Sequence, residues 1–262
     1  MKLGLLSWPA VPPDALLAVP LGATEQHGPH LPLGTDTVIA EALAARLAAS
    51  VGGVVVAPAL PYGSSGEHAG FAGTLSIGQV GLEVVVTELV RSADAFAGAV
   101  LISAHGGNAE PLARAVAALT REGRSVLAWS PSRACLPGTD AHAGRIETSL
   151  MLALAPDDVD PEAARAGNRR PLGELAAALR AGGVRSVSPN GVLGDPTGAT
   201  AAEGRRLLDT MAADLIAAVE QWRASASGPA GDRTRRRVAA GAGRPRGRRP
   251  RPALSLGHPR RS

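Results

Sequence analysis

Short apolar runs and amphipathic stretches alternate along most of the chain. Four runs rich in Val, Leu, Ile and Ala have the length and composition of buried strands, at residues 15–22, 54–63, 99–107 and 125–130. Stretches with apolar residues at helical spacing predict helices at 36–52, 78–98, 108–123, 146–156 and 201–224. Strand and helix in alternation predict an α/β fold, with a mostly parallel sheet and helices on both of its faces.

Two stretches do not fit a simple alternation. Residues 157–202 are rich in Gly, Pro and Arg and contain no long amphipathic segment, so we expect loops or a small excursion there. The last predicted helix carries an apolar stripe suited to packing in the core or against another subunit: Leu207, Leu208, Met211, Leu215, Ile216, Val219 and Trp222.

Charge is distributed unevenly and divides the chain into two parts. Residues 228–262 contain eleven arginines and one acidic residue, Asp232, so they carry +10 while the rest carries −6. A mixture of Arg, Pro, Gly and Ala without apolar periodicity cannot bury enough surface to offset the entropy of ordering. We therefore predict a folded domain over 1–227 and a disordered basic tail over 228–262.

The basic tail has two interpretations. It can be an arm that contacts nucleic acid or another anionic surface, or a solvated extension. No aromatic residue is interleaved with its arginines for stacking on bases, which favours the solvated extension and argues against a nucleic-acid partner.

Cysteine content and apolar run lengths limit the remaining classes. Cys135 is the only cysteine, which excludes an internal disulfide and a cysteine metal cluster, so a metal would need His and carboxylate ligands. Apolar stretches such as 51–60 are too short to cross a bilayer, and residues 1–10 lack the features of a secretion signal. We expect a cytoplasmic protein that does not bind membranes.

Polar side chains follow the first predicted strand, at the edge where parallel sheets bind ligands. Glu25 and His27 are two residues apart, so in an extended chain they point to the same side, where a metal could bridge them. Asp36 follows nine residues later, after a loop of Gly and Pro that can turn the chain back. Asp36 can be a ligand or the N-cap of the next helix. We expect His30 at the surface or behind the ligands.

His105 follows the third predicted strand and precedes Gly106, Gly107 and Asn108. It can be a ligand at the same edge, although a single histidine after a strand is often structural. The glycines permit close backbone approach and Asn108 can cap the next helix. A phosphate cradle is disfavoured, because this loop has neither the lysine of a P-loop nor the glycine spacing of a dinucleotide site.

His142 and Glu147 form a third polar cluster. On one continuous helix, residues five apart differ by about 140° in direction, which is poor for sharing a ligand. We therefore expect His142 in the loop that enters the helix and Glu147 in its first or second turn, where Glu147 can also be an ordinary surface residue. The glycine-rich stretch 62–74, with Glu67 and His68, is expected to form a flexible wall of a substrate site.

Five motifs in a fixed order resemble the creatininase family of metal-dependent amide hydrolases. They are TEQHGPHLPLGTDT, YGSSGEHAGFAGT, AHGGN, HAGRIETS and GVLGDPTGATAAEG, and the resemblance covers about residues 7–223. Within the family, the sequence of residues 20–36, 165–172 and 184–206 is most similar to that of a subgroup of peptidases. That subgroup removes a C-terminal Val-Tyr dipeptide from a modified precursor peptide during maturation of a redox cofactor.

The resemblance implies a three-layer αβα sandwich that assembles as a homo-oligomer, in several members a hexamer. It also implies two divalent ions, zinc or iron(II) with manganese as a further candidate, and a set of ligands with Asp36 bridging: Glu25, His27, Asp36, His105 and Glu147. His142 corresponds to the histidine that assists proton transfer, with Glu147 as a second candidate for that role. The chain departs from the family at Ser103–Ala104, where Asn-Gly is common, and at Ala72, where Pro is common.

The chemistry of these residue types agrees with that implication. Imidazole and carboxylate ligands suit borderline divalent ions, and two such ions can promote amide hydrolysis. A serine nucleophile is disfavoured, because the candidate serines lack a G-x-S-x-G elbow. Our first hypothesis is a metallopeptidase acting on a short modified peptide. The alternatives are an amidohydrolase acting on a cyclic amide or formamide, and a non-enzymatic binding module whose tail contacts nucleic acid.

Overall fold

The computed structural model describes residues 1–132 and 140–226. Met1–Ala224 form one compact unit, and of the second unit, which starts at Ser225, only the last residues of a helix are described. The predicted tail, and with it the tail's predicted disorder and its boundary at residue 227, lies outside the described residues.

A four-stranded parallel sheet lies at the centre of the compact unit. Its order is β2-β1-β3-β4, with β1 at Leu16–Leu21, β2 at Val54–Val56, β3 at Gly98–Ser103 and β4 at Val126–Trp129. The α-helices are α1 (Thr35–Ser50), α2 (Gly78–Arg91), α3 (Ala109–Arg121), α4 (Arg145–Leu154), α5 (Leu172–Val187) and α6 (Ala201–Ala226). Six short 3₁₀ helices complete the described elements: η1 (Leu3–Leu5), η2 (Trp8–Ala10), η3 (Gly66–His68), η4 (Gly106–Asn108), η5 (Pro156–Asp158) and η6 (Pro161–Ala163).

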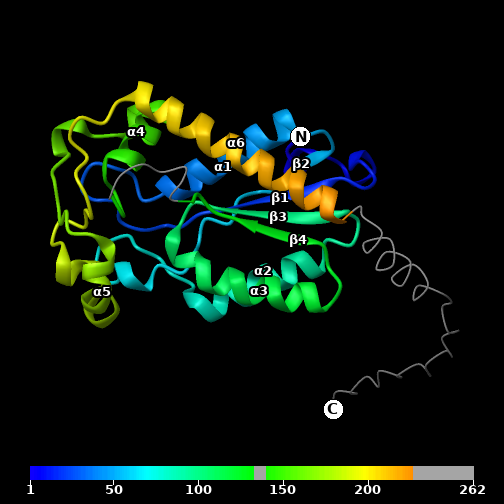
Figure 1. Cartoon of the computed structure of the whole chain (residues 1–262), viewed down its shortest axis with the longest axis horizontal. Helices are drawn as coiled ribbons and strands as arrows, with labels where there is room; N and C mark the ends of the chain where they lie inside the picture. Colours follow the sequence, from blue (N-terminus) through cyan, green and yellow to red (C-terminus); the bar gives the residue numbers. More distant parts are fainter. Residues whose placement is uncertain (133–139, 227–262) are drawn as a thin grey trace, which may run out of the picture. The chain divides into compact units, whose positions relative to one another are not determined.

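Helices cover both faces of the sheet, as predicted. In Figure 1, α1, α4 and α6 lie on one side of the strands, and α2 and α3 lie on the other. Every residue of β1 is buried, and its side chains alternate between two apolar clusters. Leu16 and Ala18 belong to the cluster under α1, α4 and α6, whereas Leu17, Val19 and Leu21 belong to the cluster against α2 and α3. The predicted sandwich of α/β type is confirmed.

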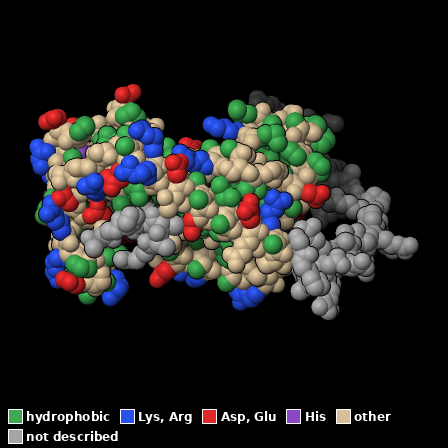
Figure 2. All heavy atoms as spheres, turned by 45° about the horizontal axis from the view of Figure 1, so that its top comes forward, with side chains coloured by type: hydrophobic (Ala, Val, Ile, Leu, Met, Phe, Trp, Pro, Cys, Tyr) green, Lys and Arg blue, Asp and Glu red, His purple; other side chains and the backbone are tan. Residues whose placement is uncertain are grey.

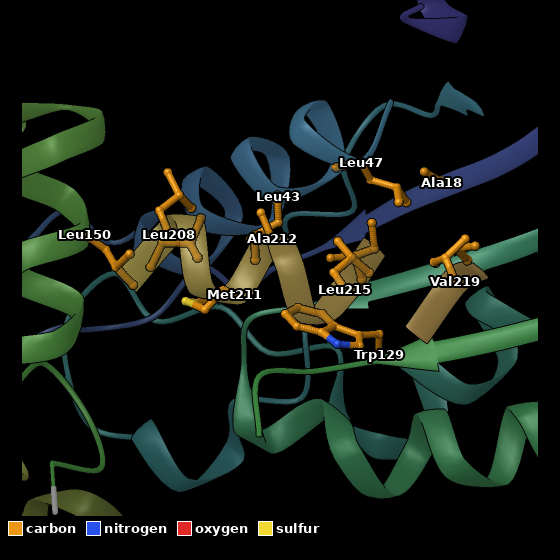
Figure 3. Packing of buried hydrophobic residues seen from close by; sticks show 14 of the residues in the cluster. Ala18, Leu43, Leu47, Trp129, Leu150, Leu208, Met211, Ala212, Leu215 and Val219 are labelled. Carbon is orange, nitrogen blue, oxygen red and sulfur yellow. The ribbon is translucent and has the colours of Figure 1, made fainter. Parts of the chain in front are cut away.

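The apolar stripe predicted for the last helix packs into the core. Figure 3 shows Leu208, Met211, Leu215 and Val219 along α6, with Leu208 next to Leu150 of α4 and Leu215 next to Trp129 of β4, and all of them belong to one core cluster. The Trp129 indole Nε1 donates a hydrogen bond to the Asp214 carboxylate at 2.8 Å, so the polar edge of this large side chain is satisfied.

Three predicted elements differ from the structure. The strand expected over 54–63 is regular only at Val54–Val56, and Leu60 forms a single bridge with Leu21. The helix expected over 78–98 ends at Arg91, and Gly98, the last residue expected in it, begins β3 instead. The expectation of no long element in 157–202 was wrong, since α5 occupies sixteen of those residues and bends at Gly183, where φ is +67°.

The register of the two central strands determines where the following loops begin. Leu21, the last residue of β1, pairs with Ser103, the last residue of β3. The chain therefore leaves both strands side by side at one edge of the sheet. The chain runs from β1 through α1 to β2 on one side of β1, and from β2 through α2 to β3 on the other side, which creates the crevice where open α/β sheets bind ligands.

On the face seen in Figure 2, Lys and Arg side chains lie among Asp and Glu side chains, and histidine scarcely appears. The five described histidines are all buried. None of the described helices is long and apolar enough to span a membrane.

Candidate metal centre

Acidic and imidazole side chains from four segments meet at the edge where β1 and β3 end. Glu25 and His27 come from the loop after β1, and His105 follows β3 directly. Asp36 lies in the first turn of α1 and Glu147 in the first turn of α4. Three groups have ligand atoms within 4.8 Å of one another: Glu25, His27 and His142; Glu25, Asp36 and His105; and His27, Asp36 and Glu147.

Asp36 belongs to two of these groups, and each of its two carboxylate oxygens faces a different histidine. Its Oδ1 lies 3.4 Å from His27 Nε2, and its Oδ2 lies 3.3 Å from His105 Nδ1. Such a carboxylate can bridge two cations. The helix N-cap is Gly34 and Asp36 is inside the helix, so the N-cap interpretation was wrong. A carboxylate in the first turn is favoured by the helix dipole.

Backbone carbonyls fix which nitrogen each histidine presents to the centre. His27 Nδ1 lies 3.1 Å from the Glu25 carbonyl, and His105 Nε2 lies 3.0 Å from the Ser64 carbonyl. A carbonyl only accepts, so each of these nitrogens carries the proton and donates it. In the neutral rings, His27 Nε2 and His105 Nδ1 therefore keep lone pairs, and these are the nitrogens facing Asp36. Metal-bound histidines in proteins are oriented in the same way.

Four of the buried side-chain atoms without hydrogen-bond partners are atoms that a cation would use. Among the described residues, Glu25 Oε1 and Oε2, His27 Nε2 and Asp36 Oδ2 are buried and have no hydrogen-bond partner. A buried acceptor left unpaired costs about 1–3 kcal/mol, and a charged one costs more. Several such acceptors converging on one volume fit divalent cations well.

The carboxylates and imidazoles of this cluster shift one another's pKa values strongly. Burial would lower the pKa of His27, but the Asp36 carboxylate outweighs it and raises the pKa to about 9. The pKa of His105 is also raised well above its usual value, because the facing Asp36 and Glu25 carboxylates outweigh burial, which would lower it. Burial would raise the pKa of Asp36, but the neighbouring His27 and His105 lower it below its usual value. Protons on His27 and His105 thus balance the negative charge of the neighbouring carboxylates.

His142 and Glu147 have the arrangement predicted for them. His142 precedes α4, which begins at Arg145, and Glu147 lies in its first turn. Between them Ala143 has a φ of +51°, and its N–H donates to Glu147 Oε2. Burial raises the pKa of Glu147 to about 7, so this carboxyl group differs from an ordinary surface glutamate.

A small cavity borders His142 and Glu147. The rest of its lining is largely apolar and combines loop residues, such as Ala104 and Pro131, with Ile39 of α1, Leu150 of α4 and Met211 of α6. The cavity therefore offers space for an apolar group next to the polar cluster.

The loop 62–74 contributes more than the predicted flexible wall. His68 ends η3 and is buried, with Nε2 3.2 Å from Glu25 Oε1. Burial lowers the pKa of His68 to about 4. Glu67 Oε1 lies 3.8 Å from His105 Nε2, and burial raises the pKa of this carboxyl group. His68 could have been found from its place after the β2 segment, which reaches the same edge of the sheet.

His30 takes the second of its two expected positions, behind the ligands: it is buried, and its Nε2 lies 2.9 Å from Thr148 Oγ1, next to Glu147 in the chain. The expected cap by Asn108 needs correction. Asn108 makes no side-chain cap to α3. Its amide instead donates to the Gly22 carbonyl, and its Oδ1 accepts from the Ser64 N–H. Asn108 thus ties the loop before η3 to the end of β1.

Comparison with known proteins agrees with this architecture. The family model for creatininase, described as creatinine amidohydrolase, matches residues 5–219. The chain belongs to the creatininase family. It is accordingly a hydrolase acting on amide bonds, which confirms the predicted enzyme class and argues against the non-enzymatic binding module.

Several curated relatives carry the name mycofactocin precursor peptide peptidase. One, from Mycolicibacterium smegmatis, is 47% identical over 219 residues, covering 81% of this chain and 87% of the relative. Another, from Mycobacterium tuberculosis, is 49% identical over 216 residues, covering 79% of this chain and 85% of the relative.

Solved creatininases share the fold. A crystal structure of creatinine amidohydrolase superposes with a TM-score of 0.68 at 26% identity, covering 84% of this chain and 96% of that one. Other creatininase structures with a TM-score of 0.67 are described as a Zn-Zn type and as a manganese form.

Proposed function

We propose that this protein is a metal-dependent peptidase that releases the C-terminal Val-Tyr dipeptide from the modified mycofactocin precursor peptide. Its relatives at 47% and 49% identity, named mycofactocin precursor peptide peptidase, support a peptidase role. The observation that carries metal dependence is the buried cluster of unpaired carboxylate and imidazole acceptors at the edge of the sheet.

Two cation positions follow from the grouping of ligand atoms. Glu25, Asp36 and His105 would hold one ion, and His27, Asp36 and Glu147 would hold the other, with Asp36 shared. Zinc, iron(II) and manganese all suit imidazole and carboxylate ligands. When bound, two divalent cations lower the pKa of water and polarise the amide carbonyl.

His142 is suited to carry a proton to the departing amine. Its Nε2 lies 2.7 Å from the Gln26 carbonyl and therefore donates, so Nδ1 is unprotonated and lies 3.9 Å from Glu25 Oε1. Burial lowers the pKa of His142 well below its usual value, which keeps the ring neutral at neutral pH. Glu147, with its pKa near 7, is the second group able to exchange a proton at neutral pH.

The competing assignment inside the family is a small-molecule amidohydrolase. A creatinine amidohydrolase from Pseudomonas putida is 31% identical over 176 residues, covering 56% of this chain and 67% of the relative. The lower identity and coverage favour the peptidase assignment. The cavity with apolar lining beside Glu147 also suits a peptide side chain.

The decisive experiment offers both substrate classes to the full-length protein loaded with Zn²⁺, Mn²⁺ or Fe²⁺. Mass spectrometry of the modified precursor peptide should show loss of the Val-Tyr dipeptide, while creatinine and a formamide should remain intact. Hydrolysis of the small amides without dipeptide release would replace the peptidase assignment with the amidohydrolase.

A matched pair of variants tests the ligand assignment. His105→Ala should abolish turnover and reduce metal content, because it removes one imidazole from the Glu25 and Asp36 group. Asp209→Ala, at an exposed residue that pairs with Arg46, should change neither quantity. Equal activity of His105→Ala and the parent protein would contradict the assignment. A chain ending at residue 227 should retain hydrolysis.

A further inference from the structure

Gln26 lies between two proposed ligands, and its buried amide has an unambiguous orientation. Its Oε1 accepts from the Gly28 N–H at 2.8 Å, and its Nε2 donates to the Gly191 carbonyl at 3.1 Å. A backbone N–H only donates and a backbone carbonyl only accepts, so exchanging the two amide atoms would break both hydrogen bonds. The second N–H of the Gln26 amide needs a separate acceptor.

Two histidines lie within reach of this remaining N–H. Gln26 Nε2 is 2.8 Å from His68 Nδ1 and 3.1 Å from His142 Nε2. His142 Nε2 already carries a proton, since it donates to the Gln26 carbonyl at 2.7 Å. A protonated ring nitrogen has no lone pair to accept with. The second amide proton therefore goes to His68 Nδ1.

We infer that Gln26 is a positioning residue that holds His68 as the Nε2–H tautomer, with this N–H facing Glu25 Oε1 at 3.2 Å. Acceptance at Nδ1 requires that the proton of the neutral ring sits on Nε2. His68 thus has a role different from that of its neighbours: the neutral rings of His27 and His105 present lone pairs to Asp36, and His68 presents a donor to Glu25.

A donor at this position orients the Glu25 carboxylate. Oε1 faces His68, whereas Oε2 lies 3.3 Å from His105 on the other side. In the opposite tautomer, a ring lone pair would face the carboxylate oxygen and repel it. Groups that orient a ligand carboxylate or imidazole typically change metal affinity or activity 10–100-fold when mutated. This consequence for metal binding rests on the proposed metal centre, whereas the tautomer itself does not.

The chain leaves space for the Gln26 amide at Gly191. Gly191 has a φ of +81°, and a Cβ on it would collide with the Gln26 amide. The loop after α5 is thus shaped around this side chain, which is 5% exposed.

The test reads the histidine tautomers directly by ¹⁵N NMR of full-length protein labelled at histidine, metal-free and loaded with Zn²⁺. His68 should show a protonated Nε2 and an unprotonated Nδ1 in both states, with its signals assigned from their loss in His68→Gln. In Gln26→Met, which has similar size but no donor, the Nε2–H signature of His68 should be lost and Zn²⁺ affinity should fall about 10–100-fold. Gln221→Met, at an exposed position of α6, is the matched control and should leave both unchanged.

A second pair of variants keeps the inference testable if Gln26→Met does not fold. His68→Gln retains an N–H near the place of Nε2 and should keep Zn²⁺ affinity within a few-fold, whereas His68→Leu should reduce it as Gln26→Met does. An Nδ1–H tautomer of His68 in the parent protein, or equal affinities of His68→Gln and His68→Leu, would overturn the inference. The predicted tautomer without peptide cleavage would count against the proposed function alone, and cleavage with the wrong tautomer would count against this inference alone.

Discussion

His105 keeps its position in the cluster because Gly107 has no side chain. A Cβ at Gly107 would lie 2.5 Å from His105 Nε2 and 2.5 Å from Glu67 Oε1, and it would collide with the Ser64 carbonyl. We expect Gly107→Ala to displace His105 and to cost about 1–3 kcal/mol of folding free energy through overpacking. Metal content and peptide turnover should fall together, as measured by metal analysis and the dipeptide assay.

The neighbouring glycine provides the control. A Cβ at Gly106 would meet no atom within 4 Å, so Gly106→Ala should behave like the parent protein. Similar losses in the two variants would show that the loop tolerates no change of any kind, and the specific collision at Gly107 would then not be the cause.

Protonation of His27 makes metal binding dependent on pH. Its pKa of about 9 in the metal-free protein means that the ring is protonated at neutral pH, whereas a bound cation needs it neutral. Each proton displaced makes the affinity rise about tenfold per pH unit as long as the pH is below that pKa. Because the pKa of His105 is raised as well, Mn²⁺ affinity should increase about 10–100-fold between about pH 7.5 and 8.5. Competition with a chelator measures this, and a flat profile would contradict it.

The helix α5 connects the region after η6 with the wall of the cluster, and its bend has a steric cause. Gly183 has a φ of +67°, and a Cβ on it would lie 2.6 Å from the Glu67 carbonyl. Gly183→Ala should therefore push α5 away from η3, destabilise the protein by more than about 1 kcal/mol and weaken peptide binding. Chemical denaturation and the KM for the peptide measure the two effects.

Gly173, near the start of the same helix, separates this effect from helix propensity. A Cβ at Gly173 meets nothing within 4 Å, so Gly173→Ala should be neutral or stabilise the helix by up to about 1 kcal/mol. If both substitutions stabilised the protein, the bend at Gly183 would have no structural role.

Strand and helix periodicity predicted most elements, and the failures have identifiable causes. The strands β1 and β3 are buried on both faces and read as continuous apolar runs. The helix α5 was missed because Gly173, Gly182 and Gly183 interrupt its apolar spacing and lower its propensity. The predicted end of α2 was too late because residues 92–97 contain Ala and Phe, which continue the apolar pattern of the helix. In the structure these residues form a turn.

The site residues were predictable where charged or imidazole side chains follow directly after a predicted strand. Glu25, His27 and His105 are charged or imidazole groups directly after apolar runs, and the structure brings them together. His68 and Gln26 were not singled out as site residues. The β2 segment that leads to His68 has only three regular strand residues, and the role of a neutral amide depends on neighbours distant in sequence, such as Gly191 and His142.

For the whole compact unit, the cluster links metal binding to stability. Removing a bound metal would leave the buried acceptors of Glu25 and Asp36 without a cation, so the folded state alone loses favourable interactions. At a free ion concentration 100-fold above Kd, binding stabilises the native state by about 2.7 kcal/mol. That corresponds to a fall in Tm of roughly 5–10 °C on treatment with EDTA.

Differential scanning calorimetry with and without added Mn²⁺ measures this shift. Re-addition of Mn²⁺ should restore the original Tm, and Mg²⁺, which prefers oxygen ligands and dehydrates reluctantly, should restore less. A Tm insensitive to EDTA in protein shown by metal analysis to have lost its ions would contradict the link.

The spacing of the proposed ligands along the chain also has a consequence during synthesis. During synthesis, the group of Glu25, Asp36 and His105 is complete once His105 has been added to the chain. The group of His27, Asp36 and Glu147 is complete only later, when the first turn of α4 has been synthesised. The proposed ions would therefore be acquired in a defined order if loading starts on the ribosome, and a chain arrested between these points would hold one ion but not both.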